Sequence, residues 1–148
     1  MFERKPDPPG FRQSAALPYR RTKGGCEVLL ITSRTNRRWI IPKGLIEPNM
    51  TAPQSAALEA FEEAGVRGKM CDACLGTYGV EKYGTQGTVE VYAMRVTEEL
   101  DKWPEQADRQ RQWLPIEQAI TTAGDEGVAE ILRGFAAGKK WKKKKNGG

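Results

Sequence analysis

Three glutamates, Glu59, Glu62 and Glu63, stand close together in the alanine-rich stretch 54–64, which belongs to a helix predicted to begin at Thr51 or Ala52 and to stop at Gly65. At about 100° per residue, Glu59 and Glu63 lie one turn apart on the same face of such a helix, with Glu62 beside them. Clustered carboxylate oxygens are the ligands that Mg²⁺ and Mn²⁺ prefer. An ordinary solvated helix face explains the spacing alone more simply, so the metal interpretation depends on the surrounding residues.

The chain contains no histidine and only three cysteines, Cys26, Cys71 and Cys74. A serine or cysteine nucleophile paired with histidine is therefore excluded, as is a histidine general base. Cys71 and Cys74 have the spacing of half a zinc site, but a closed site needs four ligands. We interpret the cysteines as thiols of a reducing compartment. Catalysis by this chain must use carboxylates, lysine, tyrosine or a metal ion held by oxygen atoms.

The net charge of +5 is concentrated at the C-terminal end. Without the six lysines of residues 138–148, 18 basic residues stand against 19 acidic ones, so the rest of the chain carries a net charge of −1. A lysine run at a terminus is typical of a solvated tail. We therefore expect contact with nucleic acid only weakly, through this tail.

The residues around the glutamates resemble the signature of the Nudix hydrolases, G-x5-E-x7-R-E-U-x-E-E-x-G-U, in which U is aliphatic. The matching positions are Gly44, Glu59, Glu62, Glu63, Gly65 and Val66. The resemblance covers residues 14–136, and LLITSRTNRRWIIPKGLIEPNM and VTEELDKWPEQADRQRQWLPIEQAI resemble the diphosphoinositol polyphosphate phosphohydrolases and their bacterial relatives. It implies an α/β fold, a Nudix-type α/β/α sandwich with a mixed β-sheet between helices.

The same resemblance implies a hydrolase of phosphoanhydride (diphosphate) bonds in which water attacks phosphorus. Glu59, Glu62 and Glu63 would be the ligands of Mg²⁺ or Mn²⁺ and the catalytic carboxylates, one of them activating the water. A metal ion neutralises phosphate oxygens and acidifies the attacking water, so histidine is not needed. The substrates implied are diphosphoinositol or dinucleoside polyphosphates. A densely phosphorylated inositol needs a strongly basic pocket, which the near-neutral body of the chain does not favour.

Two positions depart from the signature. Met50 stands where the family has the first glutamate, and Leu58 stands where it has an arginine that helps to hold the glutamates in place. Glu47 is close enough in the chain to replace part of the missing charge. A degenerate Nudix domain that binds a nucleotide or polyphosphate without efficient catalysis is therefore the alternative hypothesis.

Basic residues before the signature are candidates for substrate binding, because arginine contacts phosphate through two N–H groups at once. Arg34, Arg38 and Lys43, together with Gly44, form this predicted set; an exposed basic loop is the alternative interpretation. Further acids on the neighbouring strands are Glu81 and Glu90, for which exposed strand positions are the simpler interpretation.

Hydrophobic patterning and turn residues predict the remaining elements. We expect extended segments at residues 14–20, 27–33, 39–41, 70–83, 87–97 and 111–114, helices at 116–122 and 126–137, and a hairpin turn at 84–87. We predict a flexible leader at residues 1–12, the Nudix hydrolase domain at 13–137 and a flexible lysine-rich tail at 138–148. The apolar stretches are too short to cross a membrane and no secretory signal is present, so we expect a cytoplasmic protein. The oligomeric state has no signature in the sequence.

Overall fold

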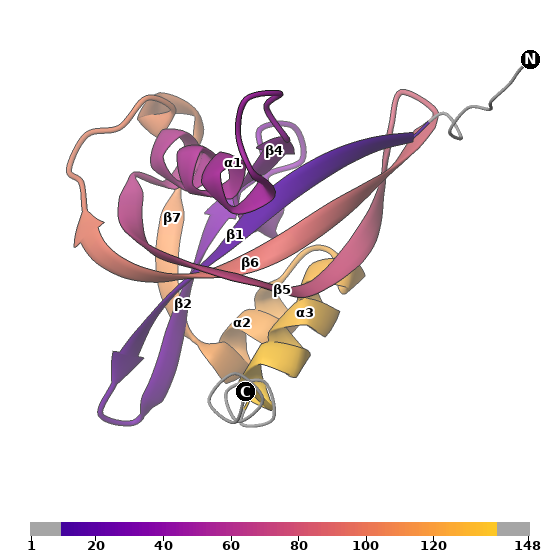
Figure 1. Ribbon diagram of the computed structural model, residues 1–148. Coiled ribbons are helices and arrows are strands. Elements are labelled where there is room, and N and C mark those ends of the chain that lie inside the picture. Colours follow the sequence, from indigo (N-terminus) through magenta and orange to yellow (C-terminus); the bar gives the residue numbers. More distant parts are fainter. Residues whose placement is uncertain (1–9, 139–148) are drawn as a thin grey trace, which may run out of the picture.

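The computed structural model describes residues 10–138, which form one mixed sheet with helices on both faces (Figure 1). The strands are β1 (Gly10–Thr22), β2 (Gly25–Thr32), β3 (Trp39–Ile40), β4 (Lys43–Leu45), β5 (Val66–Lys82), β6 (Thr85–Glu99) and β7 (Arg111–Pro115). The helical segments are α1 (Ala52–Glu59), a π-helical turn (Ala60–Ala64), a 3₁₀ turn (Gln106–Asp108), α2 (Ile116–Thr122) and α3 (Glu126–Ala136). The predicted α/β class, with a mixed sheet between helices, is confirmed.

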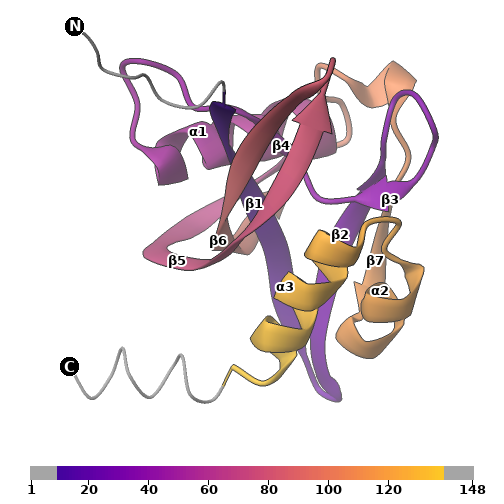
Figure 2. The same cartoon turned by 90° about the vertical axis from the view of Figure 1, so that its right-hand side faces the viewer.

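The long strands β1 and β6 run parallel to each other at the centre of the sheet, whose order is β3–β2–β1–β6–β5. The other pairs of strands are antiparallel. One edge of β1 carries two partners in succession, β4 near its start and β2 near its end. Helix α1 lies on one side of the sheet, and α2 and α3 lie together on the other (Figures 1 and 2).

Side-chain alternation along β1 and β2 divides their apolar residues between the two faces of the sheet. On one face, Leu17, Val28 and Leu30 pack against α2 and α3. On the other, Ala16, Leu29 and Ile31 pack against Ala56, Ala60 and Ala64 of the α1 segment. Small alanine side chains let this helical segment lie close to the sheet, and this fixes the position of the glutamates it carries.

The helical segment that carries the glutamates begins with a capping box and ends at a left-handed glycine. The Thr51 hydroxyl accepts a hydrogen bond from the Gln54 N–H (3.2 Å), and the Gln54 side-chain oxygen accepts one from the Thr51 N–H (2.9 Å). Gly65 ends the segment at φ 69°, a conformation that glycine adopts without strain. The α-helix begins at Ala52 as predicted but stops at Glu59 and continues as a π-helical turn, so the prediction of one regular helix up to Gly65 was incomplete.

Three further differences come from pairing between distant segments. Strand β1 begins at Gly10 because residues 10–12 pair with β6, so the predicted leader extends too far; residues 1–9 lie outside the described range. The segment predicted at 39–41 forms β3 only over residues 39–40, and residues 43–45, for which no strand was predicted, form β4 against β1. The hairpin turn lies at Tyr83 and Gly84, both at positive φ, and not at 84–87. Across residues 10–138, no helix is long and apolar enough to cross a membrane.

Candidate active site

Most of the predicted site residues surround one pocket of about 690 Å³, between the start of β1, β4, the α1 segment and the start of α3. Six of them line it: Arg34, Arg38, Lys43, Gly44, Glu59 and Glu63. They come from three stretches of the chain, the loop before β3, strand β4 and the α1 segment, which the fold brings together. Glu62, the seventh, does not line this pocket.

Glu63 is the most buried carboxylate of the pocket, with a side chain that is 9% exposed. Its Oε1 accepts a hydrogen bond from the Lys43 backbone N–H (3.2 Å), and its Oε2 lies 3.6 Å from Nη2 of Arg109. Burial raises the pKa of Glu63 to about 8, although the Arg109 charge opposes the shift. The adjacent Glu59 carboxylate adds to the rise because it accepts a hydrogen bond from the protonated Glu63 carboxyl. A bound cation would stabilise the ionised form of this buried carboxyl group.

The Glu59 carboxylate lies directly against the backbone of Gly44. A Cβ atom added at Gly44 would stand 2.2 Å from Oε2 and 2.4 Å from Cδ of Glu59. Burial raises the pKa of Glu59, the hydrogen bond from Glu63 lowers it, and the charges of other nearby glutamates raise it further. Glycine at position 44 therefore leaves the space that the Glu59 carboxylate occupies.

The prediction that all three glutamates stand together on one face fits only Glu59 and Glu63. The π-helical turn carries Glu63 inward alongside the buried Ala60 and Ala64, whereas Glu62 remains only half-buried. The backbone carbonyl of Glu62 accepts a hydrogen bond from the Glu105 N–H (3.0 Å), and its carboxylate raises the pKa of Glu59 from a distance. Within residues 10–138, no three histidine, cysteine or acidic side chains are close enough together to form a metal-binding group.

The basic residues of the pocket have different partners. The Lys43 side chain donates a hydrogen bond from Nζ to Gln13 Oε1 (3.2 Å), and burial lowers its pKa. Arg34 pairs with Glu105 (3.6 Å) and Asp108 (3.3 Å) at the rim. Arg38 is exposed, and its Nη1 donates to the Gly124 carbonyl (3.0 Å).

The connection between β6 and β7 brings residues that the sequence did not predict. It lies beside the α1 segment (Figure 1) and caps its C-terminal end: the Trp103 indole N–H donates to the Glu63 carbonyl (3.1 Å), and Arg111 donates to those of Ala64 and Gly65. Glu105 and Arg109 of this connection line the pocket. They are more than forty residues from Glu63 in sequence, and no local pattern links them to it.

The positions that depart from the Nudix signature lie outside this pocket. Leu58 lines a separate groove with Phe61, Arg67 and Met94. Met50 lines a second, larger cavity and is 38% exposed. Glu47, the expected replacement, lines both cavities, and its charge raises the pKa of Glu59. The backbone of Glu47 is fixed by a hydrogen bond to the buried Ser55 hydroxyl (2.9 Å).

Of the two further acids, Glu81 lines the pocket, and so does its neighbour Lys82. Glu90 instead pairs with Arg12 on the neighbouring strand and accepts a hydrogen bond from the Tyr92 hydroxyl (2.9 Å). That ion pair neutralises the charge of Arg12, which lines the second cavity.

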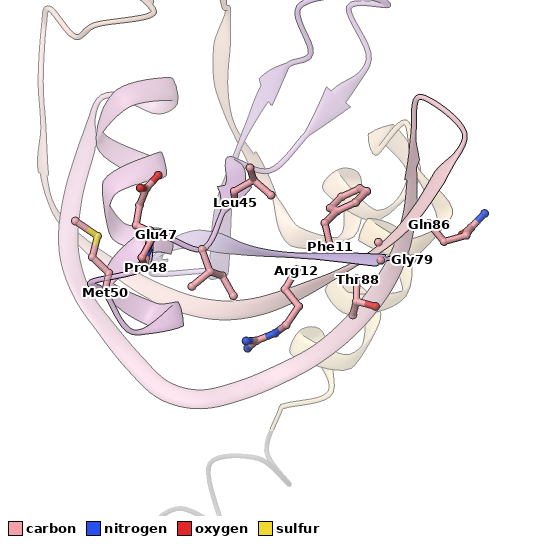
Figure 3. Close-up of a pocket in the computed structure, with 12 residues that line it drawn as sticks. Phe11, Arg12, Leu45, Glu47, Pro48, Met50, Gly79, Gln86 and Thr88 are labelled. Carbon is pink, nitrogen blue, oxygen red and sulfur yellow. The ribbon is translucent and has the colours of Figure 1, made fainter. Parts of the chain in front are cut away.

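The second cavity, of about 1,240 Å³, adjoins the first and shares four residues with it, Phe11, Leu45, Glu47 and Gly79. Figure 3 shows Met50, Pro48 and Glu47 on one side, Phe11 and Thr88 on the other, and Leu45 between them. Leu45 is 56% exposed, and the Phe11 ring lies against Gly87. This cavity presents apolar surface next to the carboxylates of the first pocket.

Comparison with known protein families identifies the family to which this fold and pocket belong. The family model of the NUDIX domain matches residues 10–135, which is nearly the whole of the described chain. The chain belongs to the Nudix family. This finding confirms the predicted resemblance and the predicted class of protein, the Nudix hydrolases. The pocket described above lies within the matched region of this Nudix domain.

Curated relatives of this Nudix domain include phosphohydrolases. It is 39% identical over 117 residues to the bovine diphosphoinositol polyphosphate phosphohydrolase 3-beta, covering 77% of this chain and 70% of the relative. It is 34% identical over 119 residues to the mitochondrial Nudix hydrolase 12 of Arabidopsis thaliana, covering 74% of this chain and 58% of the relative. The chain thus spans less than two thirds of the length of that relative.

Solved structures show the same fold. The crystal structure of the C. elegans Ap4A hydrolase has a TM-score of 0.71 and 25% identity, covering 86% of this chain and 96% of that one. A NUDIX hydrolase from Nitrosomonas europaea has a TM-score of 0.71 at 18% identity, covering 90% and 91% of the two chains. These likenesses confirm that the mixed sheet and its flanking helices form a Nudix-type sandwich.

Proposed function

We propose that this protein is a divalent-metal-dependent hydrolase of phosphoanhydride bonds, acting on a nucleoside or inositol polyphosphate-type substrate by attack of water on phosphorus. The observation that carries the proposal is the paired burial of Glu59 and Glu63 in a pocket that also contains Arg34, Arg38 and Lys43. Family membership and relatives named as phosphohydrolases support the same reaction class.

The two carboxylates fit a divalent cation by their chemistry. Their oxygen atoms are hard ligands, and burial raises both pKa values, a cost of ionisation that a bound cation would remove. Glu59 and Glu63 would hold Mg²⁺ or Mn²⁺, with Glu62 as the third ligand expected from the signature and Glu47 and Glu105 as nearby acids. When bound, the ion supplies charge neutralisation and an acidified water.

The residues of the chain itself bind and orient the substrate. Arg34 and Arg38 line the pocket from one loop and Lys43 lines it from β4, so they suit the several oxygens of a polyphosphate. One of the three signature glutamates, Glu59, Glu62 or Glu63, takes the proton of the attacking water.

The second cavity favours a nucleoside end over a densely phosphorylated inositol. Its apolar surface, from Phe11, Leu45 and Met50, suits a planar organic group. Its cation, Arg12, is already paired with Glu90 through two N–H groups. An inositol ring that carries many phosphates would find little compensating charge there.

The experiment is phosphate release from dinucleoside polyphosphates, nucleoside diphosphate derivatives and diphosphoinositol polyphosphates, with and without Mg²⁺ or Mn²⁺. We expect metal-dependent turnover, highest for the nucleotides, and loss of turnover in Glu63→Gln. Glu98→Gln is the matched control, because Glu98 is exposed on β6 and pairs only with Arg67 in the described structure. Equal release by wild type and Glu63→Gln would contradict the proposal.

The second candidate function is a non-catalytic binding domain, which Met50 and Leu58 favour because they remove a carboxylate and a cation from the signature. It is distinguished by thermal melts with the same compounds. A nucleotide that raises the melting temperature but releases no phosphate with either metal would support this candidate over the enzyme.

We further propose a cytoplasmic location and a small-molecule ligand, with nucleic acid bound at most weakly through residues 138–148. The lysines of that tail lie outside the described residues. Because the Arabidopsis relatives are named as mitochondrial, fractionation of the tagged protein in its own cells is the appropriate test. Deletion of residues 138–148 tests the tail: RNA binding that survives deletion would exclude it.

A further inference from the structure

Arg109 is the buried cation nearest to the paired glutamates. Its side chain is 8% exposed, and an arginine is almost never buried without partners. Nε and Nη2 donate to Glu105 Oε1 (3.0 and 2.9 Å), and Nη1 donates to the Thr32 carbonyl (3.1 Å). The guanidinium is therefore held from two directions, by the β6–β7 connection and by the end of β2.

These contacts leave one edge of the guanidinium facing the candidate metal site. Nη2 lies 3.6 Å from Glu63 Oε2, while the other Glu63 oxygen accepts the Lys43 backbone N–H. A planar guanidinium held by several hydrogen bonds has little freedom to rotate. Arg109 is thus a fixed positive charge beside Oε2 of Glu63, while the Lys43 backbone N–H holds Oε1.

The signature position that normally supplies a cation carries Leu58, which lines a different groove. We propose that Arg109 is the positioning residue of this site: it holds the Glu63 carboxylate in place for the metal ion, as a cation supplied from outside the glutamate helix. This inference rests on the proposed function. Glu105 orients Arg109, and Arg34 at the rim pairs with Glu105 in turn.

The test is Mn²⁺ affinity, measured from the electron paramagnetic resonance signal of the free ion, together with steady-state kinetics. Residues that orient metal ligands typically contribute roughly 10–100-fold to metal affinity or activity. We expect Arg109→Gln to weaken Mn²⁺ binding by about tenfold or more and to lower kcat more than it changes KM. Arg109→Lys should recover part of both losses. Arg133→Gln, on the exposed face of α3, is the control.

Mn²⁺ affinity of Arg109→Gln within twofold of wild type would overturn the inference, as would a rise in KM alone, which would make Arg109 a substrate contact. If Arg109→Gln does not fold, the same measurement is made on Glu105→Gln, which removes the charged partner of Arg109 and leaves Glu63 intact. Unchanged Mn²⁺ affinity in Glu105→Gln would also overturn the inference. Wild-type protein that binds Mn²⁺ but hydrolyses nothing would refute the proposed function, while the affinity comparison would still decide the role of Arg109.

Discussion

Replacement of Gly44 by alanine should displace the Glu59 carboxylate while leaving the fold intact. A Cβ atom at this position would lie 2.2 Å from Oε2 and 2.8 Å from Oε1 of Glu59. Non-bonded heavy atoms rest at about 3.5 Å, so the carboxylate must move by about 1 Å. A shift of about 1 Å in a catalytic group costs on the order of 100-fold in rate. We therefore expect kcat to fall by about two orders of magnitude.

The effect on stability should be much smaller. Gly44 is not at positive φ, so alanine fits its backbone. The colliding atoms are the end of a flexible side chain, and alanine also restricts the unfolded chain, so the free energy of unfolding should change by less than about 1 kcal/mol.

The assay for Gly44→Ala combines metal-dependent phosphate release with chemical denaturation. Gly134→Ala is the matched control, because Gly134 is exposed in α3 with no atom within 4 Å of the added Cβ. That variant should keep full activity and gain roughly 0.5–1 kcal/mol of stability. Activity of Gly44→Ala within threefold of wild type, in a folded protein, would refute the placement of Glu59 beside Gly44.

Three other predictions follow from the buried carboxylates and the α3 cap. Burial raises the pKa of Glu63 from 4.5 to about 8, so its protonated form is favoured in the fold and metal-free protein should lose stability as the pH rises from about 4.5 to about 8. Thermal melts in EDTA should show this loss in wild type and a smaller one in Glu63→Gln; equal losses would contradict it. Glu62→Gln should lower kcat/KM less than Glu59→Gln, because Glu62 does not line the pocket; the reverse order would contradict the described site. Asp125→Ala should cost about 1 kcal/mol in urea denaturation, because its carboxylate accepts the N–H groups of residues 127 and 128; unchanged stability would contradict the cap.

The parts of the fold that depend on local patterns could be predicted from the sequence. The apolar run at residues 27–33 predicted β2, and Gly65 predicted the end of the helical segment that carries the glutamates. The full length of β1 and the short strand β4 could not be predicted, because both depend on pairing between distant segments. No turn or periodicity near Pro42 indicates that β1 provides an edge for residues 43–45.

The candidate site was predictable where its residues belong to a contiguous signature. The six predicted residues that share the pocket all lie between 34 and 63 in the chain. The inward rotation of Glu63 by the π-helical turn could not be predicted, since a regular helix places Glu59, Glu62 and Glu63 on one solvated side. Arg109 and Glu105 could not be predicted because only the folded β6–β7 connection brings them to Glu63.

We propose that Glu59 and Glu63 together bind the metal ion on which hydrolysis depends. The decisive measurement titrates Mn²⁺ into wild-type protein and into the double variant Glu59→Gln/Glu63→Gln, and follows the free ion by electron paramagnetic resonance. Both proteins must first show the same circular dichroism spectrum. We predict that wild type removes free Mn²⁺ from solution and the double variant does not. Equal Mn²⁺ binding by the two proteins would contradict the claim.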